Sequence, residues 1–451
     1  MPSLLIRNAA VLVTMDDASR EIPDGALFAR DGIIEAVGPS ESLPATADEV
    51  LDLKSHIVIP GLVNTHHHLY QNLTRVVPAG QDQSLFGWLK ALYPIWARMG
   101  PEHIRISALI GLAELALSGC TTASDHLYMF PNGARLDDEI EAAREIGLRF
   151  TATRGAMSIG ESGGGLPPDS IVEKPEAILK DFERVVATYH DASPHAMLRI
   201  ALAPCSPFSV SRELMRDTAD LARRLGVGLH THLAENAEDI AYSLEKFGVR
   251  PGQYVEEAGW TGPHVWHAHC CALDDAEIGL FARTGTGIAH CPSSNMRLGS
   301  GIAPIRKMLR AGVPVGLGVD GSASNDSGDL MAEARLAMLL QRVGGNAGGL
   351  TAREALRIAT RGGARVLGRG MEIGQLAPGF AADFAAYPLD TVVMAGTRWD
   401  PVAGLVFAGP QRAAFTYVGG RAVVHEGQIA RFDIQSALAS HRALATALIE
   451  G

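Results

Sequence analysis

Short apolar runs rich in β-branched residues recur through the middle of the chain, and segments with helical spacing separate most of them. The helical segments include EHIRISALIGLAELALSG, DDEIEAAREIG and RELMRDTADLARRLG. Apolar positions three and four residues apart predict helices, whereas short continuous apolar runs between turn signals predict buried strands. The eight predicted strands cover residues 57–63, 119–126, 148–154, 198–204, 226–232, 263–267, 285–290 and 313–319. Strands that alternate with helices in this way predict an α/β fold, namely a parallel (β/α)₈ barrel of the TIM type.

Both ends of the chain have an all-β pattern instead. Residues 3–57 contain β-rich runs broken by Asp-Gly and Gly-Pro turn signals, and a similar pattern returns near the other end of the chain. The last stretch, 434–450, has the apolar spacing of a helix. We therefore predict two domains. One is the barrel, residues 58–375, and the other is a small β-sandwich with a C-terminal helix, built from residues 1–57 and 376–451.

Composition limits the kinds of partner that the chain can have. Its 451 residues are 47% hydrophobic and 20% charged, which is ordinary for a soluble globular protein. The net charge of −11 disfavours nucleic acid as a partner, because phosphate backbones attract basic surfaces. No apolar stretch reaches the ~20 residues of a membrane span, and the N-terminal stretch lacks the pattern of a secretion signal. Five scattered cysteines are typical of reduced thiols, so we expect a cytoplasmic protein that does not bind membranes.

Three consecutive histidines follow the first predicted strand, in the stretch PGLVNTHHHL. Side chains alternate between the two faces of a strand, so His66 and His68 are expected to point the same way while His67 points the other way. Two imidazoles on one face at the end of a buried strand indicate a metal site rather than a loose surface tract.

Residue types that bind metals also follow three other predicted strands. His232 ends the fifth strand, and Glu235 comes three residues later. His269 follows the sixth strand and Asp320 follows the eighth. In a (β/α)₈ barrel the carboxyl ends of all strands meet at one mouth, so these side chains are expected to converge there.

This set of residues suits a hydrolytic metal, which needs nitrogen and oxygen ligands and an open position for water. The predicted ligands are His66, His68, His232 and Asp320. Such a site accepts zinc, which we favour, or iron, and it makes hydroxide available at neutral pH. Glu235 is predicted to move the proton of the water to the leaving group, and His269 to stabilise charge at the attacked carbon. Asp320 can serve both as a ligand and as a proton acceptor.

Several motifs resemble those of the amidohydrolase superfamily, in the branch of aminohydrolases that deaminate heterocycles. They are PGLVNTHHH (60–68), HLAE (232–235), AHC (268–270), AHCPSSN (289–295), GVDGSASN (318–325) and IGQLAPGFAADF (373–384). The resemblance implies the same metal ligands and proton-transfer residues. Two-metal members of the superfamily often bridge their ions with a modified Lys on the fourth strand, and LRIALAPCSP (198–207) has no Lys. The resemblance therefore implies one divalent metal per chain.

The same resemblance bears on the substrate. Nucleoside deaminases of this branch hold ribose hydroxyls with a Glu where this chain has Trp96, and they have a His where this chain has Cys205. The loss of both polar groups favours a flat free base. The residues expected to contact it are Gln71, Trp96, Tyr128, Arg154 and Cys205. Stretches such as HHHLYQNLTR and APCSPFSVS are most similar to the 8-oxoguanine deaminases, which implies hydrolysis of 8-oxoguanine to urate and ammonia.

Other functions stay open at this point. The metal site alone does not separate 8-oxoguanine from guanine, isoxanthopterin or cytosine, or from hydroxytriazines that lose an amine, an alkylamine or chloride. Outside the enzymes, the alternative is an inactive scaffold barrel, which is disfavoured because every expected metal and proton-transfer residue is present. The expected partner is a small heterocyclic base, and the resemblance also allows a homo-oligomer.

Overall fold

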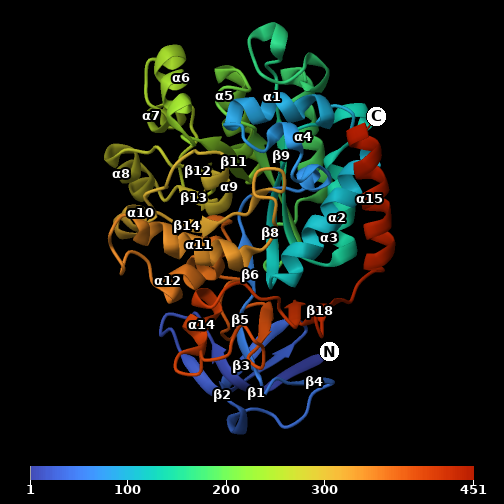
Figure 1. The fold of residues 1–451 in the computed structure, drawn as a ribbon, viewed down its shortest axis with the longest axis vertical. Helices are drawn as coiled ribbons and strands as arrows, with labels where there is room; N and C mark the ends of the chain where they lie inside the picture. The colour runs from blue at the N-terminus through green and yellow to red at the C-terminus, as the bar shows by residue number, and fades with distance from the viewer. Residues whose placement is uncertain (1, 451) are drawn as a thin grey trace.

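A barrel of strands ringed by helices stands on a separate β-sheet domain (Figure 1). The computed structural model describes residues 2–450. Eight parallel strands close into the barrel, which confirms the predicted fold. They are β6 (Leu62–Asn64), β8 (Cys120–Leu127), β9 (Arg149–Ala156), β10 (Leu198–Pro204), β11 (Gly228–Leu233), β12 (Val265–His269), β13 (Gly287–His290) and β14 (Val315–Leu317).

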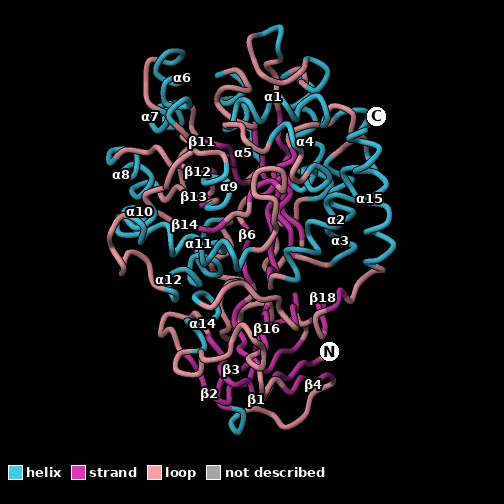
Figure 2. Tube along the Cα trace, in the orientation of Figure 1, coloured by secondary structure: helices cyan, strands magenta, loops and turns pink. Residues whose placement is uncertain are grey.

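Helices connect the barrel strands and cover the outside of the barrel, as the cyan and magenta segments of Figure 2 show. The helices before the fifth strand are α1 (Leu85–Trp96), α2 (Pro101–Leu117), α3 (Leu136–Ile146), α4 (Pro175–Tyr189) and α5 (Arg212–Leu225). Those that follow are α6 (Ala237–Phe247), α7 (Pro251–Glu257), α8 (Asp275–Thr284), α9 (Pro292–Arg297), α10 (Ile305–Ala311), α11 (Leu330–Val343), α12 (Ala352–Arg357) and α13 (Gly363–Val366), with a π-turn at Ile358–Gly362.

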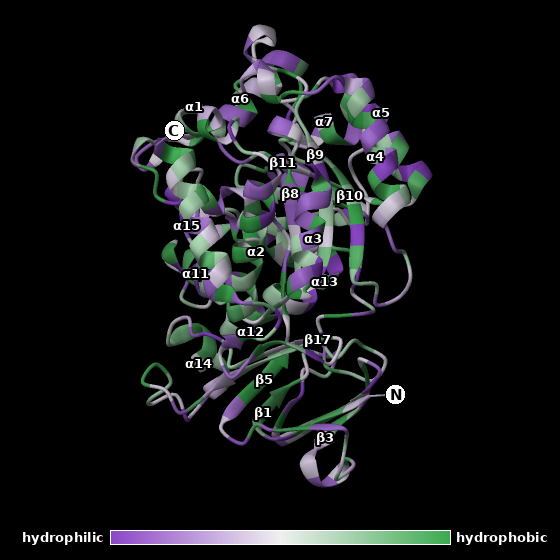
Figure 3. Ribbon diagram, turned by 90° about the vertical axis from the view of Figure 1, so that its right-hand side faces the viewer, coloured by the Kyte–Doolittle hydropathy of each residue, from purple (hydrophilic) through white to green (hydrophobic). Residues whose placement is uncertain are grey.

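Helix α5 illustrates why these segments are helical. The side chain of Ser211 accepts a hydrogen bond from the backbone N–H of Leu214 at 3.1 Å and so caps the first turn. Gly226 ends the helix with a left-handed φ of 70°, which glycine adopts without strain. Leu214, Thr218 and Leu221 lie on its buried face, and the exposed turns are hydrophilic (purple in Figure 3).

The two ends of the chain together form one nine-stranded sheet below the barrel. The first end supplies β1 (Ser3–Val13), β2 (Glu21–Arg30), β3 (Ile33–Pro39), β4 (Glu49–Asp52) and β5 (His56–Pro60). The other end supplies β16 (Phe384–Pro388), β17 (Phe415–Val418), β18 (Arg421–His425) and β19 (Gln428–Ile429), with α14 (Pro401–Phe407) between them. The sheet has an apolar core of its own, which includes Leu12, Leu27, Val58 and Phe384.

The first strand predicted from the sequence is in fact two strands. β5 pairs with β1 and β16 in the lower sheet, whereas β6 pairs with β8 and β14 in the barrel. Gly61 lies between them, packed so closely on Thr121 that a Cβ atom would overlap the Thr side chain. A single short apolar run therefore joins the two domains, and the lower sheet extends to residue 60 rather than 57.

Two further features fix the position of the lower sheet relative to the barrel. The guanidinium of Arg149, at the start of β9, forms a bidentate ion pair with Asp383 at 2.8 and 2.9 Å, just before β16. The last helix, α15 (Ile434–Glu450), runs back from the lower sheet along α2 (red in Figure 1). It also packs on the short 3₁₀ segment Leu69–Thr74 that follows the histidine cluster. The C-terminal segment therefore supports the side of the barrel mouth.

Candidate metal centre

The carboxyl ends of the first and eighth barrel strands are joined at the mouth by a short pairing. β7 (His67–His68) and β15 (Asp320–Gly321) are parallel partners, with Asp320 opposite His67. Asp320 has a left-handed φ of 60°, and its backbone N–H donates to the carbonyl of His66 at 3.1 Å. This places its Oδ1 atom 3.1 Å from Nε2 of His66 and 3.3 Å from Nε2 of His68. An unfavourable backbone conformation is thus kept where it aims a carboxylate at two imidazoles.

His232 and His269 complete the cluster from the opposite side of the barrel. Nε2 of His232 lies 3.1 Å from Nε2 of His68. Metal-binding atoms of His66, His232, His269 and Asp320 all lie within 4.8 Å of one another. The structure thus brings together every side chain that the sequence nominated as a metal ligand, from the ends of the first, fifth and eighth barrel strands.

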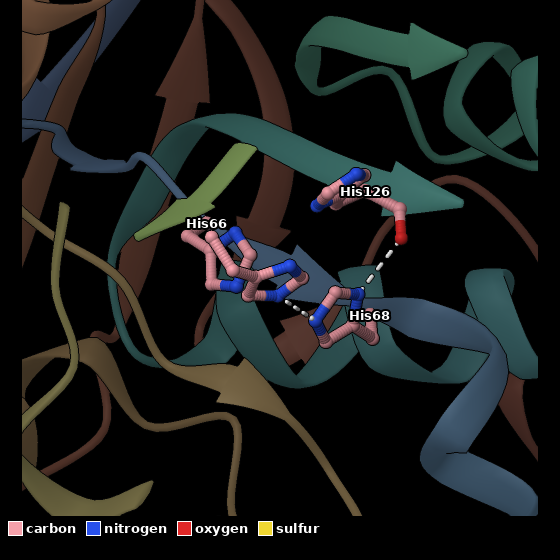
Figure 4. Close-up of side chains that lie close together, drawn as sticks. His66, His68 and His126 are labelled. Carbon is pink, nitrogen blue, oxygen red and sulfur yellow. Dashed lines mark hydrogen bonds between the residues drawn. The ribbon is translucent and has the colours of Figure 1, made fainter. Parts of the chain in front are cut away.

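The hydrogen bonds of His68 and His232 leave one nitrogen of each ring free. Nδ1 of His68 bonds the carbonyl oxygen of His126 at 2.8 Å (Figure 4), and Nδ1 of His232 bonds the carbonyl oxygen of Cys205 at 2.5 Å. A carbonyl oxygen only accepts, so each Nδ1 carries the hydrogen. Each Nε2 therefore presents its lone pair to the cluster.

His66 is oriented through a second imidazole. Nδ1 of His230 donates to the carbonyl oxygen of Trp266 at 2.9 Å, which leaves Nε2 of His230 as an acceptor. That nitrogen lies 2.8 Å from Nδ1 of His66, so Nδ1 of His66 is the donor and Nε2 keeps its lone pair. The sequence analysis assigned no role to His230. The structure assigns it the orientation of His66.

The resulting donor set fits a divalent cation. Nε2 of His66 and Oδ1 of Asp320 are buried without a hydrogen-bond partner among residues 2–450, and the lone pairs of His68 and His232 would repel one another across 3.1 Å without a cation. Burial lowers the pKa of all three imidazoles, that of His232 to about 3. Neutral imidazole is the form that binds metal. Three such nitrogens and one carboxylate match the ligands of a catalytic zinc site.

The two predicted proton-transfer residues lie together beside this cluster. Oε2 of Glu235 is 3.6 Å from Nε2 of His269, and Oδ2 of Asp320 is 4.0 Å from the same nitrogen. Burial raises the pKa of Glu235. Burial alone would lower the pKa of His269, but the charges of Glu235 and Asp320 raise it overall. Ser300, which the sequence analysis missed, donates to Oε1 of Glu235 at 2.8 Å.

Residues of the stretch AHCPSSN position two side chains of the site. At the start of α9, the amide oxygen of Asn295 lies 2.8 Å from Nδ1 of His269 and orients that ring. The hydroxyl of Ser294 donates to Ser324 at 3.0 Å, and Ser324 donates to Oδ2 of Asp320 at 3.1 Å. Neighbouring residues of α9 thus position two different side chains of the site.

Helix α9 is itself anchored by a buried carboxyl group. Glu333 of α11 accepts hydrogen bonds from the N–H and hydroxyl of Ser293, at 3.0 and 2.5 Å. It also accepts one from the amide of Asn325 at 3.0 Å, and the same amide donates to the carbonyl of Val319. Glu333 therefore links the loops after the seventh and eighth strands, a long-range contact for which the sequence carries no local signal.

A narrow cavity opens in front of these groups, and three of the five predicted substrate contacts line it. They are Gln71, Tyr128 and Cys205. The side-chain oxygen of Gln71 accepts from the backbone N–H of Ala323 at 3.3 Å, so its orientation is set by the loop after the eighth strand. Burial raises the pKa of the Cys205 thiol to about 12, so it stays neutral.

The structure does not bring Trp96 or Arg154 to this cavity. Trp96 lies one layer behind, where its indole N–H donates to Thr74 at 3.0 Å. Arg154 points outward from the barrel wall, where Glu173 and Asp181 pair with its guanidinium at 2.8 and 2.9 Å. Trp96 was nominated from the motif resemblance and Arg154 from its place at the end of a strand, and neither determines the direction of a long side chain.

Side chains of α1 cover the cavity where Trp96 was expected to do so. Leu85, Trp88, Leu89 and Tyr93 form that wall, and Trp96 packs edge-on against Trp88 and Tyr93 from behind. The cavity has a volume of about 40 Å³, far below the ~300–1,000 Å³ of typical ligand pockets. The cavity in this structure is therefore too small to hold a purine ring.

Comparison with known proteins places this arrangement among metal-dependent hydrolases. A model of the Amidohydrolase family matches residues 57–427. The chain is 46% identical over 449 residues to an 8-oxoguanine deaminase of Pseudomonas aeruginosa, with 99% of each chain covered. It is 42% identical to an isoxanthopterin deaminase of an unknown prokaryotic organism, covering 94% of this chain and 93% of the other.

A solved structure extends the comparison to the metal. The fold matches that of an atrazine chlorohydrolase from Arthrobacter aurescens complexed with zinc, with a TM-score of 0.92 and 36% identity over 98% of this chain and 100% of the other. Across the described residues, none of the helices is both long enough and apolar enough to cross a membrane. The histidine cluster at the barrel mouth is a site for a divalent metal.

Proposed function

The chain belongs to the amidohydrolase family, and we propose that it hydrolyses the exocyclic amine of 8-oxoguanine. Water and 8-oxoguanine give urate and ammonia. The observation that carries the assignment is the joint presence of a buried metal-binding cluster with an adjacent Glu–His pair in a chain 46% identical to an 8-oxoguanine deaminase. The enzyme is a metal-dependent aminohydrolase.

We assign the metal to the set of side chains whose free lone pairs converge, with one zinc ion per chain and iron as the alternative. These ligands are His66, His68, His232 and Asp320. When bound, the metal supplies Lewis acidity that lowers the pKa of a water molecule toward ~7. The absence of Lys from β10 supports a single ion.

Proton transfer is assigned to Glu235. Its raised pKa suits a group that takes a proton from water and returns it near neutral pH. The proton goes first to the ring nitrogen beside the amine-bearing carbon and then to the leaving amine, which departs as ammonia. Ser300 holds one carboxylate oxygen and leaves the other facing His269.

His269 and Asp320 are assigned to the oxygen that adds to the ring carbon. Nε2 of His269 lies between the carboxylates of Glu235 and Asp320, where it can donate a hydrogen bond to the developing oxyanion. Asn295 keeps that nitrogen pointed into the site, because it binds the opposite side of the ring.

The cavity wall favours a flat base with a lactam edge. The amide of Gln71 retains one free hydrogen and one lone pair, which match the N–H and C=O of a lactam. Tyr128, Trp88 and Tyr93 supply aromatic surface for the ring. Trp96 and Cys205 stand where nucleoside deaminases of this branch have a Glu and a His, and the loss of these polar groups favours a free base over a nucleoside.

Isoxanthopterin is the second candidate substrate. A relative that shares 42% identity is an isoxanthopterin deaminase. Isoxanthopterin carries the same amino-substituted lactam ring as 8-oxoguanine. Gln71 would therefore bind the lactam edge of both bases, and Glu235 would transfer the proton in both reactions.

The test is steady-state release of ammonia from a panel of bases. It contains 8-oxoguanine, isoxanthopterin, guanine, cytosine, an adenosine-type nucleoside and a hydroxytriazine. We expect the highest kcat/KM for 8-oxoguanine, and elemental analysis should find about one equivalent of zinc. A clearly higher value for another member would refute the substrate, and two full equivalents of metal would refute the single-ion site.

A further inference from the structure

A second carboxyl group lies beside Glu235 and has no part in the mechanism above. Asp239 stands in the first turn of α6, four residues after Glu235, and forms part of the cavity wall. Its Oδ2 atom accepts a hydrogen bond from the backbone N–H of Glu235 at 2.9 Å. Its own N–H donates to the side chain of Asn236, which caps the helix. These contacts use one of the two carboxylate oxygens.

The other oxygen of Asp239 is left without a partner. Oδ1 is buried and has no hydrogen-bond partner in the described part of the chain, and no Lys, Arg or His there forms an ion pair with the carboxylate. Its surroundings in the cavity wall include apolar Phe208 and Leu298. Burial, together with the like charge of Glu235, raises the pKa of Asp239 to about 7. A buried carboxylate oxygen of this kind needs a donor. Asp239 lines this cavity and a smaller neighbouring one, and of the two this cavity is the one that contains the catalytic groups.

The position of Asp239 relative to Gln71 determines which edge of a bound base it meets. Gln71 follows the first barrel strand and Asp239 follows the fifth, and these strands are diametrically opposite in the ring of eight. If Gln71 contacts the lactam edge of an oxopurine, Glu235 and Asp239 face the opposite edge. That edge carries N3, next to the amine-bearing carbon, and then N9–H. Glu235 is nearer the metal ligands. N3 of the base would therefore lie beside Glu235, and N9–H would lie beside Asp239.

We propose that the free oxygen of Asp239 accepts a hydrogen bond from N9–H of the substrate, and that this bond restricts the enzyme to bases without a substituent at N9. The inference rests on the proposed function and deepens it. A nucleoside carries its sugar on N9, so it both lacks the donor and places bulk against Asp239. Isoxanthopterin has an N–H at the equivalent position and meets the same requirement.

The experiment compares wild type with Asp239→Asn on two bases, 8-oxoguanine and 9-methyl-8-oxoguanine. The Asn carbonyl can still accept the N–H of Glu235, while its NH₂ group replaces the acceptor that faces the substrate. The variant thus preserves the structural contact and removes only the contact with the base. We expect kcat/KM for 8-oxoguanine to fall at least ~10-fold, the scale of a lost hydrogen bond to a charged group. The value for the 9-methyl base should change much less, so the ratio of the two values contracts.

Asn236→Ala is the matched control, because it loosens the same helix end without altering the carboxylate. It should lower both values alike and leave their ratio at that of wild type. An unchanged ratio in Asp239→Asn, or equal use of both bases by wild type, would overturn the role of Asp239 while the deaminase assignment stands. Wild type that deaminates neither base would overturn the proposed substrate, and the role of Asp239 with it.

Discussion

The barrel has a buried group of charged and polar side chains at each end, and the two groups are satisfied differently. At the lower end, Arg149 donates to Asp383 through two nitrogens and to the carbonyl oxygens of His195 and Ala196 through the third. At the mouth, Nε2 of His66 and one oxygen each of Asp320 and Asp239 find no hydrogen-bond partner within residues 2–450.

The presence or absence of a hydrogen-bond partner distinguishes a charged group that stabilises the fold from one that binds a ligand. A buried polar atom without a partner destabilises a fold by ~1–3 kcal/mol, so several of them close together indicate that a ligand supplies the missing contacts. The ion pair of Arg149 with Asp383 has its donors and acceptors matched within the chain, and it ties the lower sheet to the barrel. We therefore expect changes at the mouth to abolish activity, and changes at the lower end to affect folding.

Removal of a metal ligand should give the largest effect. His66→Ala takes away a lone pair that has no other role in the fold, so we expect loss of the metal and a fall in kcat of at least ~10³-fold, because the metal contributes several kcal/mol of transition-state stabilisation. Elemental analysis beside kinetics on the same preparation tests this. Full metal content in the variant would show that His66 is not a ligand.

The matching change at the lower end should act on stability instead. Arg149→Met leaves the carboxylate of Asp383 buried without its partner, so we expect the free energy of unfolding to fall by about 3–5 kcal/mol. Urea unfolding measures this, and turnover per folded molecule should be unchanged. The double variant Arg149→Met/Asp383→Leu should recover most of the loss, since it removes both charges. A single variant as stable as wild type would contradict the structural role.

Next in size is the proton-transfer residue. Glu235→Gln keeps the shape of the side chain and its contact with Ser300, but it can no longer take up a proton. We expect kcat to fall at least ~10²-fold, with normal metal content. Wild-type turnover would exclude Glu235 as the group that moves the proton.

The smallest effect should come from a residue that acts through another. Asn295→Ala removes the hydrogen bond that orients His269 but leaves the metal ligands alone. We expect kcat to fall about 10-fold, the lower end of the range for such supporting contacts, with little change in KM or metal content. If KM rose while kcat held, Asn295 would instead be a contact of the substrate.

Most of the fold and the centre of the site could be predicted from local pattern. The predicted strands are the strands of the barrel because their side chains must be buried on both sides, which leaves continuous apolar runs in the sequence. His66, His68, His232 and Asp320 could be nominated because a barrel collects all its strand ends at one mouth. Glu235 and His269 could be given their roles because they follow strand ends beside those ligands, and the motif resemblance implied the same roles.

The residues that line the cavity could not be predicted from local sequence patterns. Whether Trp96 or Trp88 faces the cavity depends on how α1 is rotated on the barrel, and the direction of Arg154 depends on acidic partners in a later loop and helix. Ser300 and Glu333 act across 65 and 40 residues, distances over which no local periodicity carries information.

By itself, the sequence determined which strands form and which metal-binding side chains stand at their ends, since both follow from burial and from the alternation of side chains along a strand. Only the tertiary structure decided which lone pairs are free. That property depends on the partner of every other polar atom nearby, as the chain from Trp266 through His230 to His66 and the unpaired oxygen of Asp239 show.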